Sequence, residues 1–209
     1  MDNQYATIIR DNLRALYAAG VETREACLPA KKEDERLVFH AFGDRCVISP
    51  TGITLGNETL ADARGIIISL YALKAAAEPC ITEPFKAYKE FPDTRPYAGA
   101  FHTHTEQILG PHMKMIMAGA AAIRERLDGR DAPPVLGGDL AFTVTPLPKI
   151  RLCYILYAAD EDFPATSTCL YSANADRFLP TDALADVGEY TSKKIIELTI
   201  AQNKLKNDL

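Results

Sequence analysis

The chain has 209 residues, of which 47% are hydrophobic and 24% are charged, a composition typical of globular proteins. This balance excludes intrinsic disorder, collagen-like repeats and coiled-coil rods. The formal net charge of -5 argues against nucleic acid and anionic membranes as partners, because both are bound through basic surfaces. The length predicts a single domain over residues 1–209.

Two further absences concern the cellular compartment. No apolar run reaches the roughly 20 residues that a membrane-spanning helix needs, and the first residues do not resemble a secretion signal, so we expect a cytoplasmic protein. The five cysteines have no Cys-x-x-Cys spacing, which predicts free thiols rather than a disulfide framework. These cysteines are Cys27, Cys46, Cys80, Cys153 and Cys169.

The N-terminal part begins with a predicted helix over residues 4–19, where apolar side chains recur at helical spacing and Gly20 provides a C-cap. Mixed charges over residues 31–36 indicate a solvent-exposed connection. After it, three short β-prone runs separated by turn residues predict a three-stranded meander. These runs cover residues 37–42, 45–49 and 53–55.

A second helix is expected after the meander. Thr59 and Asp62 have the spacing of a capping box, and apolar residues continue the helical pattern to Ala77. Four prolines over residues 79–96 then predict an irregular connection. A further helix is expected from about Pro96 to Leu109, and another from Pro111 to about Leu127.

The C-terminal part combines strands with a long helix. Residues 140–145 alternate in polarity, and Pro146 is expected to end this strand. Residues 150–157 are nearly all apolar, which favours a central strand, and residues 168–171 predict a shorter one. The last helix should begin near Thr181 and bury an apolar stripe on the sheet, made of Leu184, Val187, Ile195 and Leu198. The order of elements predicts an α+β fold with a mainly antiparallel sheet of short strands and four or five helices.

Three of the four histidines lie within residues 102–112. In an extended chain, His102 and His104 would share a face and could bind a metal together. In a helix, His102 and Glu106 would share a face, and His112 could join them if the chain bends at residues 110–111. We favour the helical interpretation, which makes His102, Glu106 and His112 the candidate ligands of a divalent transition metal cofactor. The alternative is that the histidines are ordinary polar residues at an exposed helix end, because the spacing matches no standard zinc pattern.

Two turns are candidates for ligand binding. Gly137 and Gly138 could let the backbone approach a ligand, with Asp139 as a polar contact. Asp160 stands in an acidic group at the end of a strand, where functional side chains are often found. Both segments have a structural alternative, since tight turns favour the same residue types.

Several segments together resemble a family known only as a domain of unknown function. The similar segments are residues 42–44, 50–52, 136–139, 146–150 and 160–165, and the resemblance extends from about residue 36 to residue 209. Members of that family occur mainly in strict anaerobes, and some carry an attached iron–sulfur domain. The resemblance implies no established activity. Because this chain lacks the cysteine-rich module, it implies that any iron–sulfur role would depend on a partner protein.

Three functional hypotheses follow. The first is a binding or accessory protein of anaerobic metabolism that holds a small ligand, cofactor or metal near residues 96–109 and 137–139. The second is a metal-dependent enzyme that uses His102, Glu106 and His112, with the acidic group near Asp160 as acid, base or further ligand. The third is a homo-oligomeric interaction module without a small-molecule site.

Overall fold

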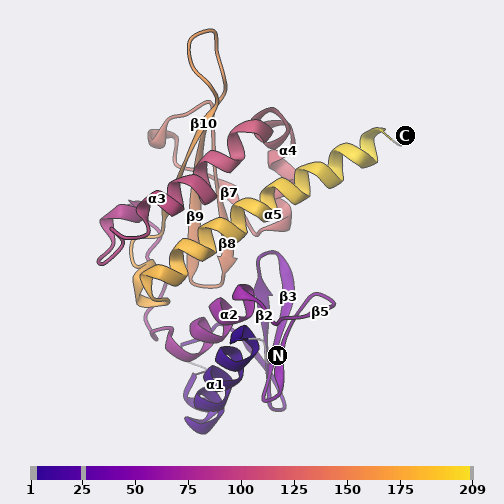
Figure 1. Ribbon diagram of the computed structural model, residues 1–209, viewed down its shortest axis with the longest axis vertical. Coiled ribbons are helices and arrows are strands. Elements are labelled where there is room, and N and C mark those ends of the chain that lie inside the picture. Colours follow the sequence, from indigo (N-terminus) through magenta and orange to yellow (C-terminus); the bar gives the residue numbers. More distant parts are fainter. Residues whose placement is uncertain (1–3, 25–26, 208–209) are drawn as a thin grey trace.

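The computed structural model describes residues 4–24 and 27–207, and it has two antiparallel sheets of five strands each with helices packed against them (Figure 1). The α+β fold with a long C-terminal helix is therefore confirmed. Within the described residues, no helix is both long enough and apolar enough to cross a membrane. All five cysteines are free thiols, as predicted.

The first sheet is a meander whose strands follow one another in sequence order. It consists of β1 (Lys31–Glu33), β2 (Arg36–Ala41), β3 (Asp44–Ser49), β4 (Gly52–Leu55) and β5 (Glu58–Thr59). The expected connection over residues 31–36 is wrong, because Lys31 to Glu33 pair with Arg36 to Val38 across a turn in which Asp34 has a φ of 57°. The charged side chains of this segment suit an exposed edge strand. A loop can have the same pattern of charges, so the pattern alone does not distinguish the two.

Two helices accompany this sheet, α1 (Gln4–Ala18) and α2 (Ala63–Lys74), and a short 3-10 turn, η1 (Val21–Arg24), follows α1. The predicted capping box is wrong: Asp62 is the N-cap of α2 and accepts a hydrogen bond from Arg64 N at 2.9 Å, whereas Thr59 belongs to β5. The helix also ends before Ala77. Lysine and arginine side chains from elsewhere in the sequence donate hydrogen bonds to the carbonyl groups at the C-terminal end of α2. These bonds stabilise the point at which the chain leaves the helix.

The second sheet has the strand order β6-β10-β9-β8-β7. Its strands are β6 (Lys86–Ala87), β7 (Arg130–Asp131), β8 (Leu140–Leu147), β9 (Ile150–Tyr157) and β10 (Thr166–Tyr171). The expectation that Pro146 ends β8 is wrong. The strand continues through a bulge between Val144 and Leu147, and the carbonyl of Pro146 accepts a hydrogen bond from Phe42 N at 2.7 Å. A proline is tolerated there because its missing N–H falls in the irregular part of the ladder.

The helical layer lies over one face of this second sheet, with α5 (Thr181–Asn207) crossing it diagonally in Figure 1. The expected continuous helix over residues 96–109 is instead three consecutive turns of different pitch: α3 (Ala98–Phe101), a π turn (His102–Glu106) and a 3-10 turn (Gln107–His112). Pro111 therefore lies inside the 3-10 turn, and α4 (Met113–Arg126) starts two residues later.

The apolar stripe of α5 is buried as predicted except at its last position. Leu184, Val187 and Ile195 are inaccessible to solvent, whereas Leu198 is half-buried beside an open groove. Tyr154 Oη of β9 lies 3.0 Å from Ser192 Oγ, which attaches the middle of α5 to the sheet through a buried polar contact. The remaining irregular segments contain the short 3-10 turns η2 (Tyr88–Glu90), η5 (Pro134–Leu136) and η6 (Ala175–Arg177).

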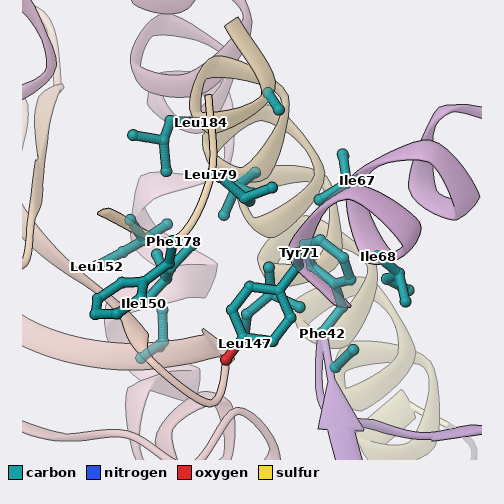
Figure 2. Packing of buried hydrophobic residues seen from close by; sticks show 14 of the residues in the cluster. Phe42, Ile67, Ile68, Tyr71, Leu147, Ile150, Leu152, Phe178, Leu179 and Leu184 are labelled. Atoms are coloured by element: carbon teal, nitrogen blue, oxygen red, sulfur yellow. The ribbon is translucent and has the colours of Figure 1, made fainter. Parts of the chain in front are cut away.

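A continuous hydrophobic core joins the two sheets (Figure 2). In Figure 2, Tyr71 of α2 lies next to Leu147, which precedes the turn between β8 and β9, and Ile150 after this turn lies beside Phe178. The Tyr71 hydroxyl also accepts a hydrogen bond from Lys149 N at 3.2 Å. Each fully buried side chain of this size contributes about 1.5 to 3 kcal/mol, so the two sheets stabilise each other.

Candidate ligand-binding site

The π turn over residues 102–106 packs against α5 at an unusually close approach. A Cβ atom added to Gly188 would lie 2.7 Å from Phe101 Cε2 and 3.0 Å from Thr105 Cγ2, and 2.6 Å from the Tyr171 hydroxyl. Only glycine therefore fits at this position of α5 without a shift of its neighbours. Since π turns inside helices are rare and occur often at functional sites, the side chains on both sides of this turn are candidates for a ligand-binding site.

On one side of the π turn, the structure brings His102 and Glu106 together. His102 Nδ1 lies 2.7 Å from Glu106 Oε2, as the shared face of the helical interpretation predicts. The other carboxylate oxygen of Glu106 accepts a hydrogen bond from Cys169 N at 2.9 Å, and Ser167 Oγ donates to the Glu106 carbonyl at 2.9 Å. Glu106 therefore attaches the π turn to β10.

His112 lies six residues further on, at the end of the 3-10 turn, and its Nδ1 atom is buried without a hydrogen-bond partner among the described residues. Across residues 4–24 and 27–207, no group of three or more histidine, cysteine, aspartate or glutamate side chains is arranged to hold a metal ion. Metal binding by His102, Glu106 and His112 stays a prediction, and it would require these side chains to move.

The glycine turn before β8 makes structural contacts. Gly137 and Gly138 have φ values of 73° and 83°, and a Cβ atom on Gly138 would lie 2.6 Å from Ile155 Cγ2. Asp139 accepts a hydrogen bond from Ala158 N at 2.8 Å, which holds the start of β8 beside the end of β9. A ligand-binding role for this turn is not required to explain its residues, and it stays a prediction.

Asp160 stabilises the turn between β9 and β10. Its Oδ1 atom accepts hydrogen bonds from Asp162 N at 2.9 Å and from Phe163 N at 2.7 Å. This arrangement is the local side-chain turn that aspartate favours. A structural role in this turn is thus sufficient to explain Asp160, and ligand binding by this residue also stays a prediction.

On the other side of the π turn, α3, the π turn and the beginning of α5 border a pocket of about 300 Å³ that is open to solvent, here called the acidic cavity. Asp182, Asp186 and Glu189 share one face of α5, because their spacing of four and three residues follows the helical repeat. The complete lining is Tyr97, Ala100, Phe101, His104, Thr105, Asp182, Ala185, Asp186 and Glu189.

The electrostatics of the acidic cavity are unbalanced. Burial raises the pKa of Asp186, and the negative charges of Glu189 and Asp182 raise it further, although Lys193 acts in the opposite direction. Lys193 forms an ion pair with Glu189 at the edge of the cavity. Among the described residues, Asp186 has neither a hydrogen-bond partner nor an ion-pair partner. The cavity therefore concentrates negative charge that Lys193 neutralises only in part.

Thr105 adds a second unsatisfied group. This residue is fully buried, it lines the acidic cavity, and its hydroxyl has no hydrogen-bond partner in the described part of the chain. Its backbone carbonyl is already satisfied by Ser192 Oγ at 2.7 Å. The hydroxyl itself is closed off from solvent, so its missing partner reflects the close packing of the π turn and does not mark a contact point for a ligand.

The sequence analysis missed the acidic cavity. The available signal was the row of acidic residues at positions 182, 186 and 189, in which only Glu189 has a lysine four residues later. Rows of this kind usually face solvent, so the row alone does not indicate a site. The partners across the cavity, Tyr97 and Thr105, are about 80 residues away in the chain, and no local pattern connects them.

Replacing Asp186 by asparagine is expected to stabilise the ligand-free protein at neutral pH by about 0.5 kcal/mol, a small value because the side chain is half-exposed and its charge is partly screened. The pKa of Asp186 is raised above its ordinary value of 3.8, so this group favours folding while it is protonated. That contribution is complete below pH 3.8 and disappears as the pH rises through the folded-state pKa. Chemical denaturation at pH 7 measures the gain. A variant that is no more stable than the parent would contradict the assigned charge repulsion.

Comparison with known proteins gives a family but no activity. No curated protein and no solved structure matches the chain. The profile of one family, described as a domain of unknown function (DUF3786), matches residues 21–194, which begins earlier and ends earlier than the region expected from the sequence. This match includes both sheets, the π turn and the acidic residues of α5. The chain therefore belongs to the DUF3786 family of proteins of unknown function.

Proposed function

We propose that the protein is a binding protein that holds a small organic cation in the acidic cavity. The observation that carries this proposal is the Asp186 carboxylate, which has no hydrogen-bond or ion-pair partner among the described residues and lines the acidic cavity beside Asp182 and Glu189. An ammonium group has three N–H donors, so it can bind oxygens of more than one carboxylate at once. A bound cation would also relieve the repulsion among the three carboxylates.

The walls of the acidic cavity suit an organic ion with a carbon chain. Its volume of about 300 Å³ corresponds to the small end of ligand-binding cavities. Phe101, Ala100 and Ala185 offer apolar contacts for methylene groups, and Tyr97 adds an aromatic ring near the acidic side chains. Aromatic rings attract cations through their quadrupoles, which adds to the attraction of the carboxylates.

Isothermal titration calorimetry with n-butylammonium chloride tests the proposal, with n-butanol as the neutral analogue. The parent protein should bind the amine and not the alcohol. Asp186→Asn should weaken amine binding about tenfold or more, because hydrogen bonds to charged groups contribute about 1.5 to 3 kcal/mol. Glu197→Gln is the matched control, since Glu197 is an exposed acidic residue of α5 outside the acidic cavity. Equal binding by Asp186→Asn and parent would refute the proposal.

A metal-dependent enzyme is the second candidate, supported by the 2.7 Å contact between His102 and Glu106. In this alternative, zinc uptake by purified protein should be stoichiometric. His102→Ala should abolish it, whereas His104→Ala should leave it nearly intact, because His104 lines the acidic cavity instead. If neither the parent nor any variant takes up zinc, the histidines have no role as metal ligands.

The wider role that we infer is an accessory protein of anaerobic metabolism. Its support is the resemblance to a family whose members occur mainly in strict anaerobes and are in some cases joined to iron–sulfur domains. An iron–sulfur partner protein is the expected interaction partner. The third hypothesis, a homo-oligomeric module without a small-molecule site, makes the opposite prediction for calorimetry, namely that no organic cation binds.

A further inference from the structure

We propose that the protein has a second binding site, in which two arginines and a glutamate hold a zwitterionic amino acid with an apolar side chain. The site is an open pocket of about 300 Å³ beside β7 and β9, here called the arginine pocket. Its charged groups are Arg130, Arg151, Glu83 and Asp131. This inference is independent of the acidic cavity and goes beyond the proposed function.

The register of the second sheet places both arginines on one face. Arg130 of β7 is paired with Thr143 of β8, and Thr143 is paired with Cys153 of β9, so these side chains point to the same side. Arg151 precedes Cys153 by two residues in β9 and therefore shares this side. Tyr154, which follows Cys153, points the other way and contacts α5. The arginine pocket thus lies on the face of the sheet that α5 does not cover.

A further wall of the arginine pocket is the segment before β6, which is held at both ends. Ile81 N donates a hydrogen bond to Asn174 Oδ1 at 2.8 Å, and the Ile81 carbonyl accepts one from Ala173 N at 2.7 Å. At the other end of the segment, β6 pairs with β10. Glu83 and Phe85 lie between these two attachments and line the pocket. The glutamate and the arginines are therefore carried by separate backbone segments, each held by hydrogen bonds.

Three charged groups in the arginine pocket have no counter-charge. Within residues 4–24 and 27–207, the side chains of Arg130, Arg151 and Glu83 form no ion pair and no hydrogen bond. Asp131, the other charged residue of the lining, is paired with Arg124. The pocket thus holds opposite charges that do not meet, two positive and one negative.

A ligand that carries both charges can bind between these groups. Guanidinium groups bind a carboxylate through two parallel hydrogen bonds, and an ammonium group donates hydrogen bonds to a carboxylate. An amino acid has both groups, so its carboxylate would bind Arg130 and Arg151 while its ammonium group would bind Glu83. The apolar part of the lining, which is Phe85, Ala132 and Pro133, suits a hydrocarbon side chain.

Isothermal titration calorimetry with L-leucine and 4-methylpentanoate tests this inference, because the second ligand has the same carbon skeleton without the ammonium group. The parent protein should bind L-leucine about tenfold or more tightly than 4-methylpentanoate, as expected for a hydrogen bond between charged groups. Glu83→Gln should bring the two affinities to within about twofold. Arg151→Gln should weaken L-leucine binding about tenfold or more. Arg95→Gln is the matched control, since Arg95 is exposed and lies outside the pocket, and it should keep the full preference.

The Asp186→Asn variant separates this inference from the proposed function. It should bind L-leucine like the parent, because the arginine pocket does not include Asp186. If Asp186→Asn loses L-leucine binding, the ammonium group binds in the acidic cavity and the arginine pocket is not the site. The inference is also wrong if the parent does not bind L-leucine, if both ligands bind equally, or if Glu83→Gln or Arg151→Gln behaves like the parent. None of these results changes the expected binding of n-butylammonium.

Discussion

Replacing Lys149 by methionine is expected to lower the free energy of unfolding by about 2 to 4 kcal/mol, a large effect for one side chain. Lys149 is only 8% exposed. Its Nζ atom donates hydrogen bonds to three carbonyl groups after the end of α2, at Ala76, Ala77 and Glu78, with distances of 2.8, 3.2 and 2.9 Å. The ammonium group also lies 5.4 Å from the centre of the Phe178 ring. Methionine fills similar space but leaves these carbonyls without their donor.

The matched control is Lys74→Met, which changes an exposed lysine at the end of the same helix. This variant should change the stability by less than about 0.5 kcal/mol, as is usual for surface positions. Urea denaturation of both variants measures the difference. If Lys149→Met were as stable as Lys74→Met, the bonds from Lys149 to the end of α2 would not hold the two parts of the structure together.

Gly188→Ala is expected to destabilise the protein by about 1 to 3 kcal/mol, the usual cost of forcing an extra methyl group into a packed region. The added Cβ would lie within 3.0 Å of Tyr171, Phe101 and Thr105, so α5 and the π turn must move apart. Because this movement separates the walls of the acidic cavity, organic cation binding should be weakened as well.

Gly99→Ala provides the control for the same chemical change. Gly99 lies in α3, close in sequence to the π turn, and a Cβ atom there would meet nothing within 4 Å. Alanine favours a helix over glycine by roughly 0.5 to 1 kcal/mol, so this variant should be slightly more stable and should bind amines normally. A result in which both alanine variants behave alike would contradict the close packing assigned to Gly188.

The strands and helices with strong periodicity could be predicted from the sequence. The central strand β9 was expected over residues 150–157 and has these bounds, since a strand buried on both faces is apolar throughout. The errors occur where a long-range contact decides the local structure. Pro146 stays in β8 because Phe42 donates to its carbonyl, and α2 ends before Ala77 because distant cations bind the carbonyls after it.

The π turn and the acidic cavity also depend on contacts between distant parts of the chain, which a sequence pattern does not show. The contact between His102 and Glu106 follows from helical spacing and was anticipated. The wider turn, however, depends on packing against Gly188, more than 80 residues away. His104 and Thr105 lie on the side of this turn that lines the acidic cavity. The charge of α5 is visible in the sequence, but the pocket that its acidic residues line can be recognised only in the folded chain.

The central claim is that an organic cation binds at this one place, and an NMR titration of the amide resonances with n-butylammonium chloride tests it most directly. Our account predicts saturable shifts confined to residues 97–106 and 181–189, where the lining of the acidic cavity lies. The acidic turn at residues 160–162 serves as an internal control, because it is exposed and equally negative. Shifts that are absent, that do not saturate, or that are as large at residues 160–162 would contradict the account.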